Sequence, residues 1–385
     1  MDTAAHERPR PAPHGLVSPR PALTAVLVAC VAAALLVGIA GGLLRAGVAL
    51  SAVGASAWVG RGALSHAALM MCGFLGTVIC IERAVAARRW QAWIPPLASA
   101  AAGVSLLLGA DAIARMLLPL SAAVFVAVNV LLWRRQPASH TMVLVASACA
   151  WLAGNVLFAA GAASHAVLPW WFAFLVLTIA AERLEMTRLM RRRPGAQASL
   201  HAVLLALAAG AALSAWAPLA GGVVFGGALL ALAAWLLAFD IARRTVRTDG
   251  LPRYMAVCLL AGYVWLGAGG IAWAATALGY PARDAALHAL GLGFIFSMIM
   301  GHAPVILPAI ARVKLLYGPW FYLPLALLHL SLAWRLGAGL HASSARSTGS
   351  AFNAVAIALF AATVIGAALA WRRRHGARPS LRSLP

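Results

Sequence analysis

The chain has 385 residues, of which 63% are hydrophobic and only 10% are charged. Soluble domains carry about a quarter charged residues, so this composition excludes a water-soluble globule. The formal net charge is +21, but the basic residues lie between apolar segments and not on one soluble face, so no nucleic-acid partner is expected. The five cysteines form no Cys-x-x-Cys pair, which argues against a disulfide framework or a thiolate metal site.

Apolar windows near the ~20 residues that cross a bilayer core recur along almost the whole chain. In hydrocarbon every backbone polar group must find its partner within the protein, which favours helices. We therefore predict an all-α polytopic membrane bundle in the lipid bilayer with about twelve transmembrane helices. Their predicted ranges are 22–44, 62–82, 91–109, 112–133, 139–161, 166–182, 198–215, 219–240, 254–278, 285–311, 319–336 and 350–371.

Three regions follow from this pattern. Residues 1–21 are polar, contain Pro, Arg and His, and show no secretory cleavage pattern, so we expect a short disordered cytoplasmic tail. Residues 22–371 form the twelve-helix transmembrane domain, and residues 372–385 form a basic cytoplasmic tail. The oligomeric state stays open.

The distribution of Arg and Lys predicts the orientation, because cytoplasmic loops carry the excess of positive charge. With both termini cytoplasmic, most of the 30 basic residues fall on the inner side of a bacterial-type inner membrane. A miscount of one helix would destroy this alternation. The outer side keeps six arginines: Arg45, Arg61, Arg115, Arg283, Arg335 and Arg346.

A repeat in groups of four helices is also suggested. The second predicted helix opens with His66 and ends near Glu82-Arg83, and the sixth opens with His165 and ends near Glu182-Arg183. The tenth opens with His288. These matches favour a three-fold pseudo-symmetry of four-helix units.

Intramembrane histidines are the sharpest sign of function, since ionisable groups inside a bilayer are costly. His66 and His288 begin two helices that run in the same direction, so both lie about one turn below the outer boundary. Two histidines at equal depth can hold one haem iron from both faces. Met70 and Gly73 share the face of His66, and Gly291 lies beside His288, where small residues let a flat macrocycle approach. The plainer alternative is that each histidine only bonds a neighbouring carbonyl.

A second pair lies deeper. His302 is about four helical turns below His288, and His329 is predicted at a similar depth on the next helix. We expect these two residues to form an inner-leaflet site for a metal or another haem, with structural roles as the alternative.

The segment from His66 to Phe74 reads His-Ala-Ala-Leu-Met-Met-Cys-Gly-Phe. It resembles the His-Ala-His-Glu-Met-Leu-Phe-Gly-Phe stretch of NnrS-type proteins, twelve-helix membrane proteins that contain haem and copper and are associated with nitric oxide stress. The segment from His288 to Met298 resembles that family's His-Ala-Leu-x-x-Gly-x-x-x-x-Met stretch. The resemblance implies haem b, with copper as a further metal, and a role in redox chemistry or nitric oxide response.

This sequence differs from the family's motif in the first segment. Ala68 and Leu69 stand where the family has its second His and its Glu. Haem–copper oxidases share the twelve-helix plan but take copper ligands from the middle of helices six and seven. Here the sixth helix has aromatic and aliphatic residues there, and the seventh has only His201 at its inner end, so no oxygen-reducing centre is expected.

The sequence thus favours a haem-binding membrane protein that exchanges electrons with a quinone or another redox partner. The main alternative is a secondary transporter of a small molecule with twelve helices and no cofactor, for which Glu82-Arg83 and Arg88-Arg89 only partly match the usual loop motif. An assembly or scaffold protein is a third reading, because a fold alone does not define a function.

Overall fold

The computed structural model describes residues 21–50, 56–186, 194–311 and 313–376, and within these ranges all regular structure is helical. Twelve helical spans are long and apolar enough to cross a membrane. The predicted N-terminal tail lies outside the described residues except for Pro21, whereas residues 372–376 of the predicted C-terminal tail are described and form the end of α16. The spans are α1 (Pro21–Arg45), α3–η1–α4 (His66–Ala87), η2–α5 (Trp90–Leu108), α6 (Asp111–Arg135), α7 (Ser139–Ala159), α8 (Ser164–Met186), α9 (Ala196–Leu213), α10 (Pro218–Phe239), α12 (Gly250–Ala277), α13–η4–α14 (Arg283–Ala311), η5–α15 (Pro319–Gly337) and α16 (Ser343–Gly376).

The predicted all-α bundle is therefore confirmed, with boundaries that differ by a few residues. Short helices add to it: α2 (Ala57–Leu64) before His66, α11 (Ala242–Thr245) and η6 (Ala338–Leu340). The largest difference is α16, which begins at Ser343 and not at residue 350. Its first two turns are polar, so hydrophobic length could not detect them, and Gly349 in this part packs on the backbone of Arg335.

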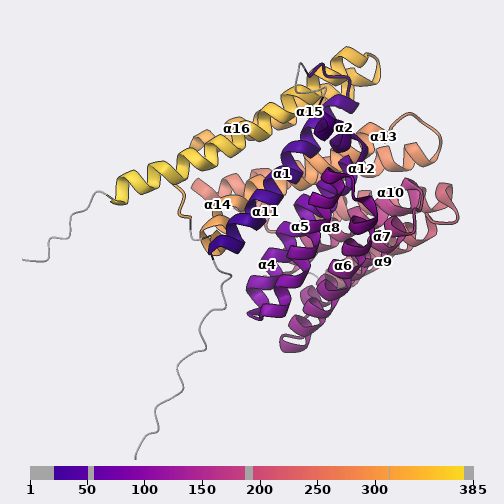
Figure 1. The fold of residues 1–385 in the computed structure, drawn as a ribbon, viewed down its shortest axis with the longest axis horizontal. Coiled ribbons are helices and arrows are strands. Elements are labelled where there is room, and N and C mark those ends of the chain that lie inside the picture. The colour runs from indigo at the N-terminus through magenta and orange to yellow at the C-terminus, as the bar shows by residue number, and fades with distance from the viewer. Residues whose placement is uncertain (1–20, 51–55, 187–193, 312, 377–385) are drawn as a thin grey trace, which may run out of the picture.

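The spans pack mainly against their neighbours in the chain, and α1 also contacts α16, so the first and last spans meet. Figure 1 shows α16 along the upper edge of the bundle, with α1 below it across the view. In each successive group of four spans the second is the most buried, with 61%, 83% and 56% of its most apolar stretch buried. This pattern fits the predicted four-helix repeat.

The second and tenth spans share an unusual backbone. Each starts with a short α-helix that carries its histidine, and each then becomes a π-helix, η1 over Leu69–Gly76 and η4 over Ala289–Phe296. π-Helical turns are rare and are frequently found at functional sites. The two spans therefore have the same departure from α-geometry directly below the same residue type.

Candidate functional site

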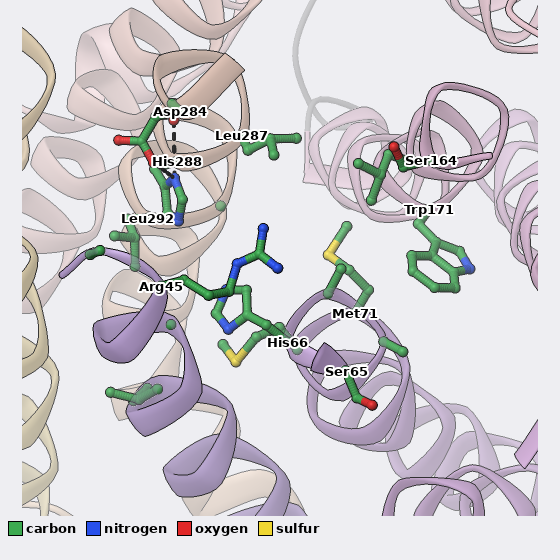
Figure 2. Close-up of a pocket in the computed structure, with 18 of the residues that line it drawn as sticks. Arg45, Ser65, His66, Met71, Ser164, Trp171, Asp284, Leu287, His288 and Leu292 are labelled. Atoms are coloured by element: carbon green, nitrogen blue, oxygen red, sulfur yellow. Dashed lines mark hydrogen bonds and ion pairs between the residues drawn. The ribbon is translucent and has the colours of Figure 1, made fainter. Parts of the chain in front are cut away.

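A cavity of about 900 Å³ lies at the end of the bundle where α1 ends, between α1, η1, α8, α13, α15 and α16. Cofactor pockets commonly measure about 300–1,000 Å³, so this volume suits a ligand larger than a few water molecules. His66 and His288 both line it, as do Met71, Trp171 and Leu287 (Figure 2).

The imidazoles of His66 and His288 face each other across this cavity. Their ring centroids are 6.5 Å apart and their planes differ by 31°. A metal–imidazole bond is about 2 Å long and the ring centre lies about 1 Å behind the nitrogen, so two imidazoles on opposite sides of one ion have centres about 6 Å apart. The separation of the two ring centres is close to that value.

Hydrogen bonds at Nδ1 orient both rings. Nδ1 of His66 lies 2.7 Å from the carbonyl oxygen of Gly38 on α1, and Nδ1 of His288 lies 3.0 Å from the carbonyl and from Oδ1 of Asp284. Since these partners are acceptors, Nδ1 carries the proton in each ring and Nε2 keeps its lone pair. A metal-ligating histidine has this arrangement, with its second nitrogen held by a carbonyl or a carboxylate.

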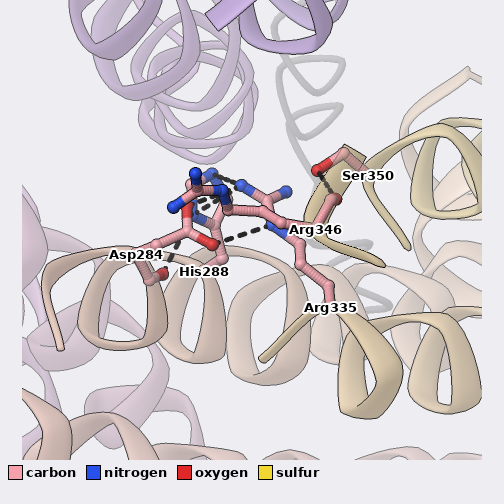
Figure 3. A network of polar contacts seen from close by, with 5 residues as sticks. All are labelled: Asp284, His288, Arg335, Arg346 and Ser350. Carbon is pink, nitrogen blue, oxygen red and sulfur yellow. Dashed lines mark hydrogen bonds and ion pairs between the residues drawn. The ribbon is translucent and has the colours of Figure 1, made fainter. Parts of the chain in front are cut away.

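Arg335 on α15 completes the support of His288 (Figure 3). Its Nε and Nη2 donate to the two carboxylate oxygens of Asp284 at 3.0 and 2.8 Å. Nη2 also lies 3.1 Å from both nitrogens of the His288 ring. An atom equally close to both nitrogens lies over the face of the ring, so the in-plane direction of the Nε2 lone pair is not blocked by Arg335.

The mouth of the cavity is strongly basic. Among the described residues, no carboxylate lies within ion-pair distance of Arg45, Arg115 or Arg346, whereas Asp111 pairs with Arg61 at 3.6 Å. Figure 2 shows the guanidinium of Arg45 directed into the cavity. The charged residues of the lining are Arg45, Arg115, Arg283, Arg335, Arg346, Asp111 and Asp284.

Of the three residues predicted to flank the cofactor, two line the cavity and one does not. Gly291 lines the cavity, and a Cβ there would meet no atom within 4 Å. Met70 also lines it, with its sulfur beside Gly38. Gly73 is not among the residues that line the cavity and faces Ala34 and Gly103 at a helix crossing. The π-helical turn changes the angular register below His66, so position i+7 no longer shares its face.

The histidines of the second predicted pair, His302 and His329, bond to other residues. Nε2 of His302 accepts a hydrogen bond from Arg183 at 2.8 Å, and its Nδ1 donates to the carbonyl of Met298. Nδ1 of His329 accepts from Nε1 of Trp265 at 2.9 Å, so the proton of this ring is on Nε2, beside Ser297. Neither histidine keeps a free lone pair for a metal. No group of three or more His, Cys, Asp or Glu in the described part of the chain is arranged to hold a metal ion.

Sequence reasoning missed Asp284, Arg335 and the basic mouth. Asp284 lies one helical turn before His288, a spacing at which side chains share a face, and this could have been noticed. Five of the six arginines predicted on the outer side line the cavity. Their position against the general distribution of Arg could therefore have indicated a site at that end of the bundle.

The fold and the twelve apolar spans define a multi-pass membrane protein. The chain belongs to the family described as a domain of unknown function, DUF8744, whose model matches residues 24–369. No curated protein and no solved structure matches it.

Proposed function

We propose that this protein binds haem b between His66 and His288 and works in redox or nitric-oxide-stress chemistry, as the NnrS-type proteins that it resembles do. The observation that carries the proposal is the facing pair of imidazoles, with centroids 6.5 Å apart and both Nδ1 atoms held by acceptors. Two ligands suffice for a haem, so the absence of a three-ligand cluster among the described residues does not bear on it.

The charge of the cavity supports an anionic, flat ligand. A haem carries two carboxylates, and Arg45, Arg115 and Arg346 are cations of the lining without a carboxylate partner in the described residues. Arginine binds carboxylates well because its planar guanidinium donates two parallel hydrogen bonds. Deeper walls such as Leu168, Phe172 and Phe296 are apolar and exclude water from the macrocycle.

When bound, a haem supplies reversible one-electron transfer. The chain contributes the two imidazoles, the orientation of each through Nδ1, and the cations for the carboxylates. Copper is not part of the proposal, because the lone pairs of His302 and His329 are already engaged.

We place the protein in a bacterial-type inner membrane with both termini cytoplasmic, on the basis of the Arg distribution. A bound haem would then lie in the outer leaflet.

A second cavity of about 220 Å³ shares Ser164, Leu168, Arg283 and Leu287 with the first and is also lined by the exposed Leu219. We propose this side cavity as the approach for a quinone, since it shares a wall with the first cavity and is lined by a residue exposed on the bundle surface.

The test is the absorption spectrum of detergent-purified protein from haem-replete cells. We expect a Soret band and sharp reduced α and β bands, which His66→Ala and His288→Ala each alter and which His375→Ala, an exposed control, leaves unchanged. A short-chain quinol should then reduce the haem. A colourless preparation would contradict the proposal, and substrate-dependent flux into liposomes with that preparation would establish the transporter alternative.

A further inference from the structure

The two histidines of the cavity are not equivalent. We propose, on the basis of the haem site above, that His288 would hold a bound haem permanently and His66 exchangeably, so that a neutral diatomic molecule such as NO or CO would bind on the His66 side.

His288 is held by a charged, interlocked support. Its Nδ1 faces the carboxylate of Asp284 at 3.0 Å, and this carboxylate is fixed by two hydrogen bonds from Arg335. Arg335 is only 7% exposed. A carboxylate behind a histidine orients the ring and increases its electron donation to the metal. These contacts join α13 to α15 and fix the carboxylate that faces His288.

His66 has a weaker support. Its Nδ1 meets a neutral backbone carbonyl, that of Gly38, and no carboxylate of the described residues lies within 4 Å of the ring nitrogens. A neutral acceptor donates less electron density through the ring than a carboxylate does. The bond from His66 to a shared iron is therefore the weaker of the two.

The backbone around His66 is also easier to rearrange. A break at Ser65, with φ −101° and ψ 13°, separates α2 from the three-residue helix α3, and the π-helix begins at Leu69. His66 thus stands on a single helical turn between two irregular points. His288 also precedes a π-helix, but its own turn is fixed by Asp284 and Arg335, so the ion pair distinguishes the two sides.

The wall on the His66 side is apolar apart from one cation. Ile39, Ala67 and Met70 line the cavity there, and Arg45 is the charged residue beside His66. With a haem bound, the reaction would be a ligand substitution in which Nε2 of His66 is released and the diatomic molecule takes its place. No electron or proton is transferred, so no further reactant is needed.

Carbon monoxide binding to the dithionite-reduced, purified protein tests the inference. In wild-type protein we expect a six-coordinate spectrum and a CO rate that stops rising at high CO concentration, because release of His66 limits it. His66→Gly should keep its haem as a five-coordinate species, bind CO at a rate proportional to CO concentration, and regain the wild-type spectrum with added imidazole. His288→Gly should lose most of its haem.

The opposite pattern, with haem kept by His288→Gly and lost by His66→Gly, would overturn the inference and leave the haem site intact. Equal haem retention and equal CO rates in both variants would overturn it too. A wild-type protein without haem would instead disprove the proposed function on which it rests.

Asp284 acts as a positioning residue for His288, and its role can be measured separately through the midpoint potential of the haem. Asp284→Asn should raise the midpoint potential of the haem, because the ring behind the iron donates less electron density, and should weaken haem retention about 10- to 100-fold. Asp284→Glu should restore both in part. An unchanged potential in a haem-loaded Asp284→Asn protein would show that Asp284 only stabilises the fold.

Discussion

Phe74 stacks on Phe296, with ring centroids 6.1 Å apart and planes 28° from parallel. Each phenylalanine lies eight residues after the histidine of its own span, His66 or His288. Two contacts between the same pair of spans, at matching positions, show that these spans lie in register. The phenylalanine pair therefore helps to set the separation of the two imidazoles.

Phe74→Ala and Phe296→Ala should each lower the melting temperature of the protein in detergent, because both side chains are buried. Their effects should not add, since each variant removes the same contact, and the coupling energy should be about 1 kcal/mol. The double-mutant cycle is measured by thermal unfolding. Phe352→Ala, at a half-exposed position on α16, is the matched control and should change little. Full additivity of the two core variants would contradict the role of the stack.

Gly291→Phe should abolish haem retention without lowering the stability of the haem-free protein. A Cβ at Gly291 meets nothing within 4 Å, so the chain tolerates the larger side chain, which then fills the space of the macrocycle. Gly366→Phe is the control, because Gly366 on α16 also has open space beside it but does not line the cavity. The ratio of haem to protein and the melting temperature decide the outcome, and full haem content in Gly291→Phe would refute the location of the site.

Asn155→Leu should destabilise the bundle. Its Oδ1 accepts hydrogen bonds from Nε1 of Trp171 at 2.9 Å and from Sγ of Cys72, and its Nδ2 donates to the carbonyl of Leu118. The substitution leaves buried polar groups on three other helices without that partner, at a cost of about 1–3 kcal/mol.

The control for this variant is Asn129→Leu. Asn129 is equally buried, but its Nδ2 donates to the carbonyl of Phe125 in its own helix, so α6 loses no contact with another helix through that bond. Thermal unfolding should therefore show a smaller loss than for Asn155→Leu. Equal losses would mean that cavity formation, and not the interhelical hydrogen bonds, dominates both variants.

Asp240 should make stability depend on pH. It lies between α10 and α11, is 3% exposed and accepts a hydrogen bond from the backbone N–H of Ala242, while its Oδ2 has no partner among the described residues. Burial raises the pKa of Asp240 above its ordinary value of 3.8. The folded protein then binds this proton more tightly than the unfolded chain, so stability falls as pH rises through and above that ordinary value.

Melting curves of wild type and Asp240→Asn test this expectation. Wild type should lose stability relative to the variant as pH rises above the ordinary aspartate pKa of 3.8, because the variant cannot ionise but keeps an oxygen for the Ala242 N–H. Below the ordinary pKa of an aspartate the two curves should converge. A constant difference between the two proteins at every pH would disprove a protonation effect.

The sequence predicts much of this fold because its signals are one-dimensional. Hydrophobic length locates twelve spans, and the excess of Arg on alternate loops supports their number. The same reasoning placed the start of α16 too late, since Ser343 to Gly349 are polar although helical. It also placed Gly73 on the face of His66, because an α-helical period cannot include the π-helix that begins at Leu69.

By itself, the sequence determined that this is a membrane bundle and that His66 and His288 begin two parallel spans, because hydrophobicity and charge act along the chain. Only the tertiary structure decided that their rings face each other, that Asp284 and Arg335 support one of them, and that His302 and His329 are held by other partners. Such contacts depend on the rotation and separation of helices far apart in the chain, which packing of side chains such as Phe74 and Phe296 sets.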